Sequence, residues 1–344
     1  MHQSKSADCR IGETFVAQDS VSLTFAVADN PHVAAIKSGA IGIRGVAPEF
    51  IDVKPQIAAY RRMVRDLEFD VCELAPTTYV IARAFGAPFI ALPIFLMRAF
   101  HHGGLLVRPD AGIAKPSDLE GKKVGVRAYS VTTGAWTRGI LIDEYGLDSS
   151  KVTWVVDDEE HVTQMQLPPN VIHAPQGSSL VSMMAAGEIQ AGFAGNAGLG
   201  RAGAPTSGWD ANKIAPGESY PDLFPNAREL EAQWHKRTGV YPMHGTIVIK
   251  ESVLKERPWV AKSLLDAFTH AKEDWLPRMC SGEANGATDQ NFRAMMDIVG
   301  ADPLPFGIAD NIKTIEALES FASKQRLTPR RLSLSELFVD PLAL

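Results

Sequence analysis

The sequence predicts an α/β fold with mostly parallel sheets, and three observations carry this prediction. Short apolar runs rich in β-branched residues alternate with helix-like segments between residues 21 and 194, and this alternation is typical of parallel α/β layers. After one more strand, at 245–250, the chain is helical in pattern. Its 344 residues are enough for two domains. A helical last third after alternating units indicates a chain that returns to complete its first domain.

The first half of the chain supplies two helices and four strands. Val21–Val27 alternates in polarity and is rich in β-branched side chains, as strands are. Pro55–Leu67 places apolar residues at helical spacing with three arginines between them, and Thr77–Phe85 is helix-like up to Gly86. We therefore predict helices at 55–67 and 77–85 and strands at 21–27, 69–74, 89–95 and 105–108.

The second half continues the alternation and then becomes helical. Two of its helices are expected to stop at Gly146 and Gly187, because glycine readily adopts the left-handed conformation that ends a helix. Residues 195–225 are dense in Gly, Pro, Ser and Asn, which predicts a loop. Strands are predicted at 124–126, 152–156, 189–194 and 245–250, and helices at 115–120, 132–145, 179–186, 259–275, 291–299 and 308–325.

The composition argues against nucleic acid and membranes as partners. Lys and Arg total 34 and Asp and Glu total 40, so the net charge is −6, whereas a nucleic-acid binder needs a basic face. A membrane helix needs ~18 apolar residues, and the longest apolar passage, Ala87–Met97, is short and holds two prolines. The N-terminus shows no apolar signal segment, so we expect a cytoplasmic protein.

The three cysteines, Cys9, Cys72 and Cys280, are far apart and odd in number. They match neither a metal-binding spacing nor a disulfide framework. We expect buried free thiols rather than a catalytic cysteine.

Arg98, His101 and His102 form the most informative cluster of polar residues. They follow a predicted buried strand and precede two glycines. Arginine can hold a carboxylate through two hydrogen bonds, and histidine can exchange a proton near neutral pH. Strand-to-loop junctions commonly carry sites in α/β proteins. From spacing alone, a substrate site and a polar hinge with satisfied histidines are equally good interpretations.

A second cluster lies where a predicted strand gives way to a helix. The N–H groups at such a helix start favour a carboxylate, and Arg127 adds a cation. Trp136 is able to flank an aromatic ring. The alternative is that Trp136 belongs to the core and that Arg138 forms a surface ion pair. The cluster consists of Arg127, Tyr129, Thr132, Thr133, Trp136 and Arg138.

Two single residues and two motifs complete the candidates. Glu73 lies among apolar strand residues, where a carboxylate has a raised pKa unless it is paired. His244 precedes a strand at a place where a cleft can form, although a lone histidine is more often structural. Asp157–His161 is a solvated acidic loop rather than a metal site, because adjacent residues rarely converge on one ion. Gly198–Gly203 matches G-x-G-x-x-G, but poor helix-forming residues follow it, so we predict a loop and no dinucleotide site.

Several stretches of the chain resemble the 4,5-dihydroxyphthalate decarboxylases, a family similar in fold to the type 2 periplasmic binding proteins. The resemblance covers nearly the whole chain. Met97 and His101 replace a serine and an arginine of the family pattern, which leaves the number of bound carboxylates open. The matching stretches are 68–74, 93–102, 136–146, 187–191, 238–244 and 311–338.

The resemblance implies two lobes with a ligand cleft between them. Lobe 1 is expected to comprise 20–104 and 244–344, with the helical C-terminal segment packed on it, and lobe 2 to comprise 105–243. The implied activity is decarboxylation of a hydroxylated aromatic acid, with a small aromatic carboxylate as partner and no cofactor. The ring carbon is protonated first, and CO₂ then leaves as aromaticity returns. The sequence leaves open whether the chain forms a homo-oligomer.

The resemblance, joined to the residue patterns, assigns each candidate a role. For acid–base chemistry we expect His102 first, followed by His244 and Glu73. Arg98 and Arg138 are expected to anchor carboxylates. The expected substrate-binding residues also include His101, Arg127, Tyr129, Thr132 and Trp136.

Two alternatives stay open. A metal site is the first, if His101, His102, His244 and Glu73 converge. The second is a solute-binding protein that captures a small aromatic or pyrimidine-like ligand without catalysis.

Overall fold

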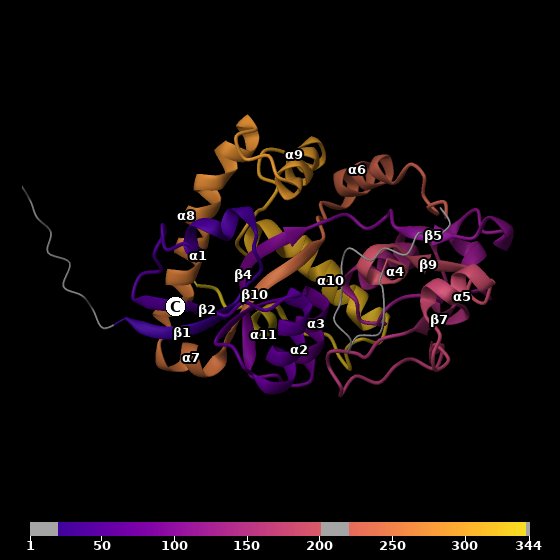
Figure 1. The fold of residues 1–344 in the computed structure, drawn as a ribbon, viewed down its shortest axis with the longest axis horizontal. Helices are drawn as coiled ribbons and strands as arrows, with labels where there is room; N and C mark the ends of the chain where they lie inside the picture. Colours follow the sequence, from indigo (N-terminus) through magenta and orange to yellow (C-terminus); the bar gives the residue numbers. More distant parts are fainter. Residues whose placement is uncertain (1–19, 201–219, 342–344) are drawn as a thin grey trace, which may run out of the picture.

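Two five-stranded sheets form the framework of the chain (Figure 1). The computed structural model describes residues 20–200 and 220–341. The first sheet has the order β2-β1-β3-β10-β4 and the second the order β5-β9-β6-β7-β8. The strands of the first sheet are β1 (Val21–Ala26), β2 (Val46–Phe50), β3 (Val71–Leu74), β4 (Phe89–Arg98) and β10 (Met243–Lys250). Those of the second are β5 (Leu105–Val107), β6 (Lys123–Gly125), β7 (Thr153–Val156), β8 (Val171–His173) and β9 (Ala191–Phe193).

The first sheet is completed by β10, a strand from late in the chain. β1 pairs in parallel with β2 and β3, whereas β10 inserts antiparallel between β3 and β4, with Thr246 opposite Leu74. β4 is buried along almost its whole length and contains most of the apolar passage at 87–97. Pro93 is tolerated there because β4 is the last strand in the sheet order, so its missing N–H costs no ladder bond on the outer side.

The second sheet is mostly parallel. β6 pairs in parallel with β7 and β9, and β7 with β8, while β5 runs antiparallel to β9. The α/β prediction is therefore confirmed, with a second sheet that is mostly parallel and a first sheet that is mixed, because β10 pairs antiparallel with both β3 and β4. Within the described residues, no helix is both long enough and apolar enough to cross a membrane. The cytoplasmic location stays a prediction.

Helices end where the glycines were expected to stop them. α4 is followed by Gly146 and α5 by Gly187, at φ of 67° and 77°, a region where side chains with a Cβ are strained. The helices of the first two-thirds of the chain are α1 (Ala34–Lys37), α2 (Gln56–Asp66), α3 (Pro76–Ala84), α4 (Thr132–Tyr145), α5 (Leu180–Ala186) and α6 (Ala227–Thr238). Those of the last third are α7 (Glu251–Glu256), α8 (Trp259–Ser281), α9 (Ala287–Val299), α10 (Ile312–Lys324) and α11 (Leu334–Leu337).

Several elements escaped the sequence prediction because they bury little apolar surface. β2 contains Pro48 and Glu49 and lies at the sheet edge. In α6 only Trp234 is buried, so the helix carries no apolar stripe. β8 has three residues. Of the cysteines, Cys72 is buried as expected, Cys280 is exposed contrary to expectation, and Cys9 lies outside the described residues.

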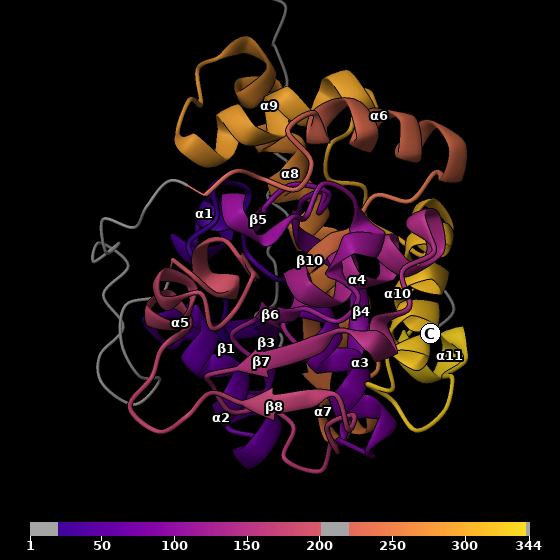
Figure 2. The ribbon, with the colours of Figure 1, turned by 90° about the vertical axis from the view of Figure 1, so that its right-hand side faces the viewer.

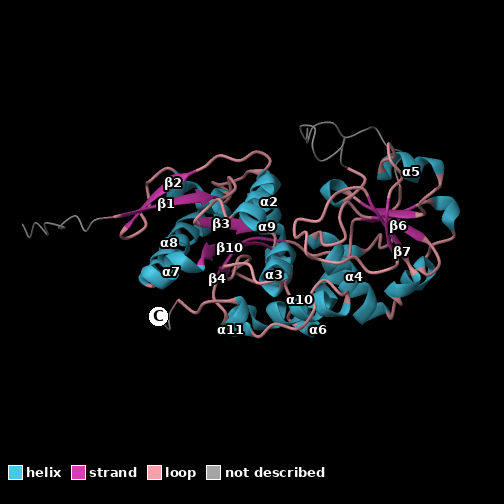
Figure 3. Cartoon of the chain, turned by 90° about the horizontal axis from the view of Figure 1, so that it is seen from below, coloured by secondary structure: helices cyan, strands magenta, loops and turns pink. Residues whose placement is uncertain are grey.

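The C-terminal helices do more than cover the first sheet. α8 packs against β4 and α1, and α9 against α6, as Figure 2 shows for the latter pair. α10 contacts α3 and also α4, so it joins the two halves of the molecule (Figure 3). The C-terminal segment therefore packs on the first sheet and its helices, as expected, and its α10 in addition contacts α4. The ring of Phe321 on α10 lies edge-on to Trp136 on α4, with centroids 5.6 Å apart.

The α4–α10 contact depends on a glycine. A Cβ added to Gly139 would overlap the ring of Phe321. We expect Gly139→Ala to lower the free energy of unfolding by about 1–3 kcal/mol, as overpacking does in cores. Urea denaturation measures this change. Gly42→Ala is the matched control, because an added Cβ there meets no atom within 4 Å; an equal loss in both variants would contradict the packing explanation.

Candidate active site

A cavity of about 720 Å³ is lined by segments that follow the carboxyl ends of strands in both sheets. Ala75 follows β3, Arg127 lies just past β6, and Asp158 just past β7. Crevices at such strand ends are the usual ligand sites of open α/β sheets. The lining consists of residues 55–58, 60–62, 75, 78, 127, 128, 130–133, 158, 161, 196, 197 and 244.

Two helices begin at this cavity. Ala75 precedes α3 and Val131 precedes α4, and both residues line the cavity. Neither has a side chain that accepts a hydrogen bond, so the first-turn N–H groups are left for other acceptors. The hydroxyls of Thr77 and Thr132 join the two helix starts at 2.7 Å. Both helix dipoles therefore favour an anion in the cavity.

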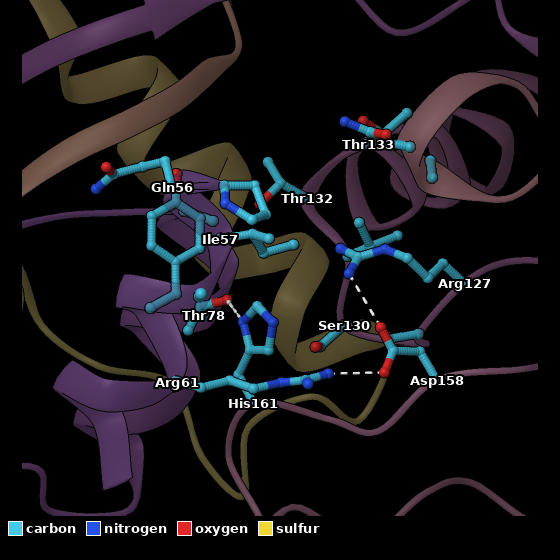
Figure 4. Close-up of a pocket in the computed structure, with 18 of the residues that line it drawn as sticks. Gln56, Ile57, Arg61, Thr78, Arg127, Ser130, Thr132, Thr133, Asp158 and His161 are labelled. Carbon is cyan, nitrogen blue, oxygen red and sulfur yellow. Dashed lines mark hydrogen bonds and ion pairs between the residues drawn. The ribbon is translucent and has the colours of Figure 1, made fainter. Parts of the chain in front are cut away.

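Arg61, Arg127 and Asp158 form a charged triad on the cavity wall (Figure 4). Arg61 Nη2 donates to Asp158 Oδ1 at 2.7 Å, and Arg127 Nη1 lies 3.2 Å from Asp158 Oδ2. The side chain of Asp158 is 2% exposed. One buried carboxylate thus holds a guanidinium from α2 and another from the segment after β6, and the triad keeps a net positive charge.

The acidic loop at 157–161 lies at the interface between the two halves of the molecule. Arg65 on α2 donates to the carbonyls of Glu160 and His161, at 2.9 and 3.3 Å. Glu160 accepts from the N–H groups of Tyr129 and Ser130 just before α4. The prediction of a solvated acidic loop is wrong for Asp158 and His161, which are buried, and holds for Glu159, which is exposed.

Two imidazoles, those of His161 and His244, belong to the lining that the described residues form. His161 Nδ1 is 3.1 Å from the hydroxyl of Thr78 on α3. Burial, with the nearby charges of Arg127 and Arg61, lowers the pKa of His161 to about 3. His244 Nε2 is 3.3 Å from the hydroxyl of Thr133, and burial lowers the pKa of His244 to about 4. Both imidazoles are therefore neutral near pH 7.

Comparison with known proteins adds an independent observation to this geometry. The chain is 31% identical over 330 residues to a 4,5-dihydroxyphthalate decarboxylase of Comamonas testosteroni, which covers 92% of this chain and 96% of that protein. The chain belongs to the 4,5-dihydroxyphthalate decarboxylase family. A second member, from Pseudomonas putida, is 34% identical over 184 residues, 51% of this chain and 71% of that protein.

The fold of this family member is that of periplasmic binding proteins, as predicted. A family model described as the periplasmic substrate-binding protein of a phosphonate ABC transporter matches residues 50–204. The crystal structure of the periplasmic aliphatic sulphonate binding protein of Escherichia coli superimposes with a TM-score of 0.50 at 12% identity, covering 94% of this chain and 93% of that chain.

Three of the residues predicted for the site line the cavity, namely Arg127, Thr132 and His244. His101 lies directly behind His244, with ring centroids 5.2 Å apart. Burial, and then the proximity of His244 and His102, holds the pKa of His101 well below its usual value. His101 thus supports the cavity wall of this family member from behind.

Arg98 is buried, but it lies outside the lining that the described residues form. Its guanidinium donates to the carbonyls of Tyr241 at 2.7 Å and Pro305 at 3.0 Å, and to the side chain of Asn311. The structure thus places the predicted carboxylate anchor in a packing role that ties β4 to the C-terminal segment. His102 is likewise buried away from the lining, with its ring centroid 5.4 Å from that of Trp234 and 6.3 Å from that of Phe224.

Arg138, Tyr129 and Trp136 form the core of the α4–α10 contact rather than the cavity wall. The Arg138 guanidinium stacks on the Tyr129 ring at 4.0 Å and donates to Gln325 at 2.8 Å. Arg138 is completely buried, so the alternative of a surface ion pair is wrong. Trp136 Nε1 donates to the carbonyl of Met243 at 3.1 Å, which holds the start of β10 beside His244.

Glu73 is buried one layer behind the lining. Its Oε2 accepts from the Ala28 N–H at 3.0 Å, and Oε1 lies 2.6 Å from where a Cβ on Gly245 would stand. Burial raises the pKa of Glu73 to about 7. Among the residues that the structure describes, no three His, Cys, Asp or Glu side chains form a metal-binding group, so Glu73 and the histidines do not converge as the metal alternative requires.

Sequence reasoning missed Arg61, Thr78, Asp158 and His161 as site residues. The available signal was the acidic run at 157–161 together with the arginines inside the helix at 55–67. The two patterns are far apart in the chain, and only the fold brings them together. Of the glycine motif, Gly198–Gly200 forms a turn and the rest lies outside the described residues.

Proposed function

We propose that this protein is a carboxy-lyase that removes CO₂ from a hydroxylated aromatic acid of the 4,5-dihydroxyphthalate type. The observation that carries the proposal is the similarity to a named decarboxylase over 92% of the chain. The charge of the cavity supports it, because guanidinium groups and two helix starts suit an aromatic ring that bears carboxylates. A volume of about 720 Å³ is ample for one such ring.

The reaction consumes one proton. A C–H bond forms at the ring carbon that bears the departing carboxylate, the bond between that carbon and the carboxylate breaks, and its electron pair returns to the ring. A hydroxyl para to that carbon supplies electron density, so the ring carbon is protonated first and aromaticity returns when CO₂ leaves. The site must therefore anchor the acid, supply a proton and exclude water.

We assign His244 as the proton donor. Its imidazole is neutral in the free protein because burial lowers its pKa to about 4. A bound dianion raises that pKa, since an opposite charge nearby favours the protonated form. The Thr133 hydroxyl orients the ring at 3.3 Å. His244 thus takes up a proton as the substrate binds and delivers it to the ring carbon.

His161 is the second imidazole of the described cavity lining, and we assign it to bind the para hydroxyl of the substrate. With a pKa of about 3 it stays neutral. When its Nδ1 donates to Thr78, 3.1 Å away, its Nε2 is a hydrogen-bond acceptor. We propose that Nε2 accepts a hydrogen bond from the substrate hydroxyl. This bond increases the electron density at the ring carbon para to that hydroxyl.

The direct test is turnover of 4,5-dihydroxyphthalate by the purified protein. We expect equal amounts of CO₂ and 3,4-dihydroxybenzoate, measured by gas release and by chromatography. Phthalate is the matched control, because it carries the same two carboxylates without a para hydroxyl and should release no CO₂.

The alternative function is a solute-binding protein for a small aromatic or pyrimidine-like ligand. The match of a substrate-binding family model to residues 50–204 favours it. Tight binding of a hydroxylated phthalate or benzoate, without CO₂ release from any of them, would reject the decarboxylase and establish this alternative.

A further inference from the structure

Arg61 and Arg127 approach the cavity from opposite halves of the molecule and meet on one carboxylate. Arg61 belongs to α2, which lies beside the first sheet, and Arg127 follows β6 of the second sheet. Asp158 binds one guanidinium on each oxygen, at 2.7 and 3.2 Å. Figure 4 shows both guanidiniums directed toward Asp158 at the edge of the cavity.

Arg61 keeps hydrogen-bonding capacity beyond Asp158. Its Nη2 donates to Asp158 and, at 3.4 Å, to the Glu159 carbonyl. Its buried Nε–H has no acceptor among the described residues. A guanidinium has five N–H donors, and a buried donor without a partner is costly. The Arg61 side chain as a whole is 23% exposed and lines the cavity, so a carboxylate there can reach its guanidinium.

We infer that Arg61 and Arg127 form a split clamp for the carboxylate that stays on the ring, with Asp158 holding the clamp in place. The inference rests on the proposed function and adds the residues that recognise the second carboxylate of its substrate. Arg61 is then the residue that selects dicarboxylates over monocarboxylates.

The assignment to the retained carboxylate follows from charge. A departing carboxylate loses its negative charge as CO₂ forms, so a full ion pair would stabilise the ground state more than the transition state and slow the reaction. The retained carboxylate keeps its charge throughout and can be ion-paired without this cost. The departing group then faces the Thr133 hydroxyl and His244, which delivers its proton to the ring carbon before CO₂ leaves, so that no ion pair holds the departing carboxylate.

Calorimetric binding of phthalate and benzoate tests the clamp independently of catalysis. The wild-type protein is expected to bind phthalate at least about 10-fold more tightly than benzoate, since charge-assisted hydrogen bonds have that magnitude. Arg61→Gln should remove most of this preference. With 4,5-dihydroxyphthalate it should raise KM about 10-fold and change kcat little, as expected for an interaction equal in ground and transition states.

Arg65→Gln is the matched control. Arg65 lies one turn further along α2 and contacts the same loop, but it is not part of the cavity lining. The inference is overturned if Arg61→Gln keeps the phthalate preference, if Arg65→Gln loses it equally, or if the wild-type protein shows none. Arg61→Lys keeps the charge but loses the paired N–H donors of the guanidinium, so it should give an intermediate preference for phthalate. An unchanged preference in this milder variant would equally overturn the inference. Absence of CO₂ release would reject the proposed function, whereas the ratio of the phthalate and benzoate affinities tests the clamp alone.

Discussion

Replacing His244 by glutamine is expected to lower the rate of CO₂ release by about 10²–10⁴-fold, the usual contribution of a positioned acid or base. Glutamine can keep a hydrogen bond to Thr133 but cannot deliver a proton. Binding of phthalate should change much less, because the charge of the cavity comes mainly from Arg61 and Arg127. Steady-state kinetics and calorimetry on the same variant separate the two effects.

His173→Gln is the control for this experiment. His173 is an exposed histidine on β8, outside the cavity lining that the structure describes. Its replacement should leave turnover unchanged. The assignment also predicts that NMR finds a higher pKa for His244 in the phthalate complex than in the free protein. Wild-type turnover in the folded His244→Gln variant would remove His244 from the chemistry.

The second large effect is loss of stability in mild acid. Burial lowers the pKa of His32 and His161 to about 3 and that of His102 and His244 to about 4. In the unfolded chain a histidine titrates near 6.5. Below that pH the unfolded state binds more protons than the folded state, so stability present above pH 6.5 falls as the pH drops toward 4.

The size of this effect follows from the number of groups. Each buried histidine costs roughly 1–2 kcal/mol by pH 5. Glu73 acts in the opposite direction, because its pKa of about 7 makes the folded state bind a proton that an unfolded carboxyl releases above about pH 4.5. One carboxyl offsets one histidine, so a net loss remains. Urea unfolding at pH 7.5, 6 and 5 measures it.

His32 gives a single-site check of the acid effect away from the cavity. Its ring lies 5.2 Å from that of Trp275 and 6.0 Å from that of Phe292 under α8. His32→Leu removes one titrating group from an apolar site, so the slope of stability against pH between 6.5 and 4 should become shallower. Stability that stays flat from pH 7.5 to 5 in the wild-type protein would contradict the acid prediction.

Local patterns were sufficient for most of the fold. Strands at 71–74, 89–98 and 243–250 and the helix at 132–145 follow from apolar spacing and from glycine stops, which depend on neighbours in the chain. The same patterns failed for α6, whose face is polar, and for the edge strand β2. Burial there is set by partners that the local sequence does not contain.

For the candidate site the sequence indicated residue types but not their orientation. Arg98 and Arg127 look equivalent along the chain, since each follows a strand. The fold directs Arg98 toward Asn311, 213 positions away, and Arg127 toward Asp158 and the cavity. Arg61 and Asp158 are 97 positions apart and share no local signal.

The sequence by itself determined the alternation of strands and helices, the return of the chain to its first sheet, and the family, because these depend on short-range periodicity and on similarity spread along the chain. Only the tertiary structure decided which arginines and histidines face the cavity. That outcome depends on how two sheets and α10 pack together, and the side chains that meet there are supplied by segments remote from one another in the chain.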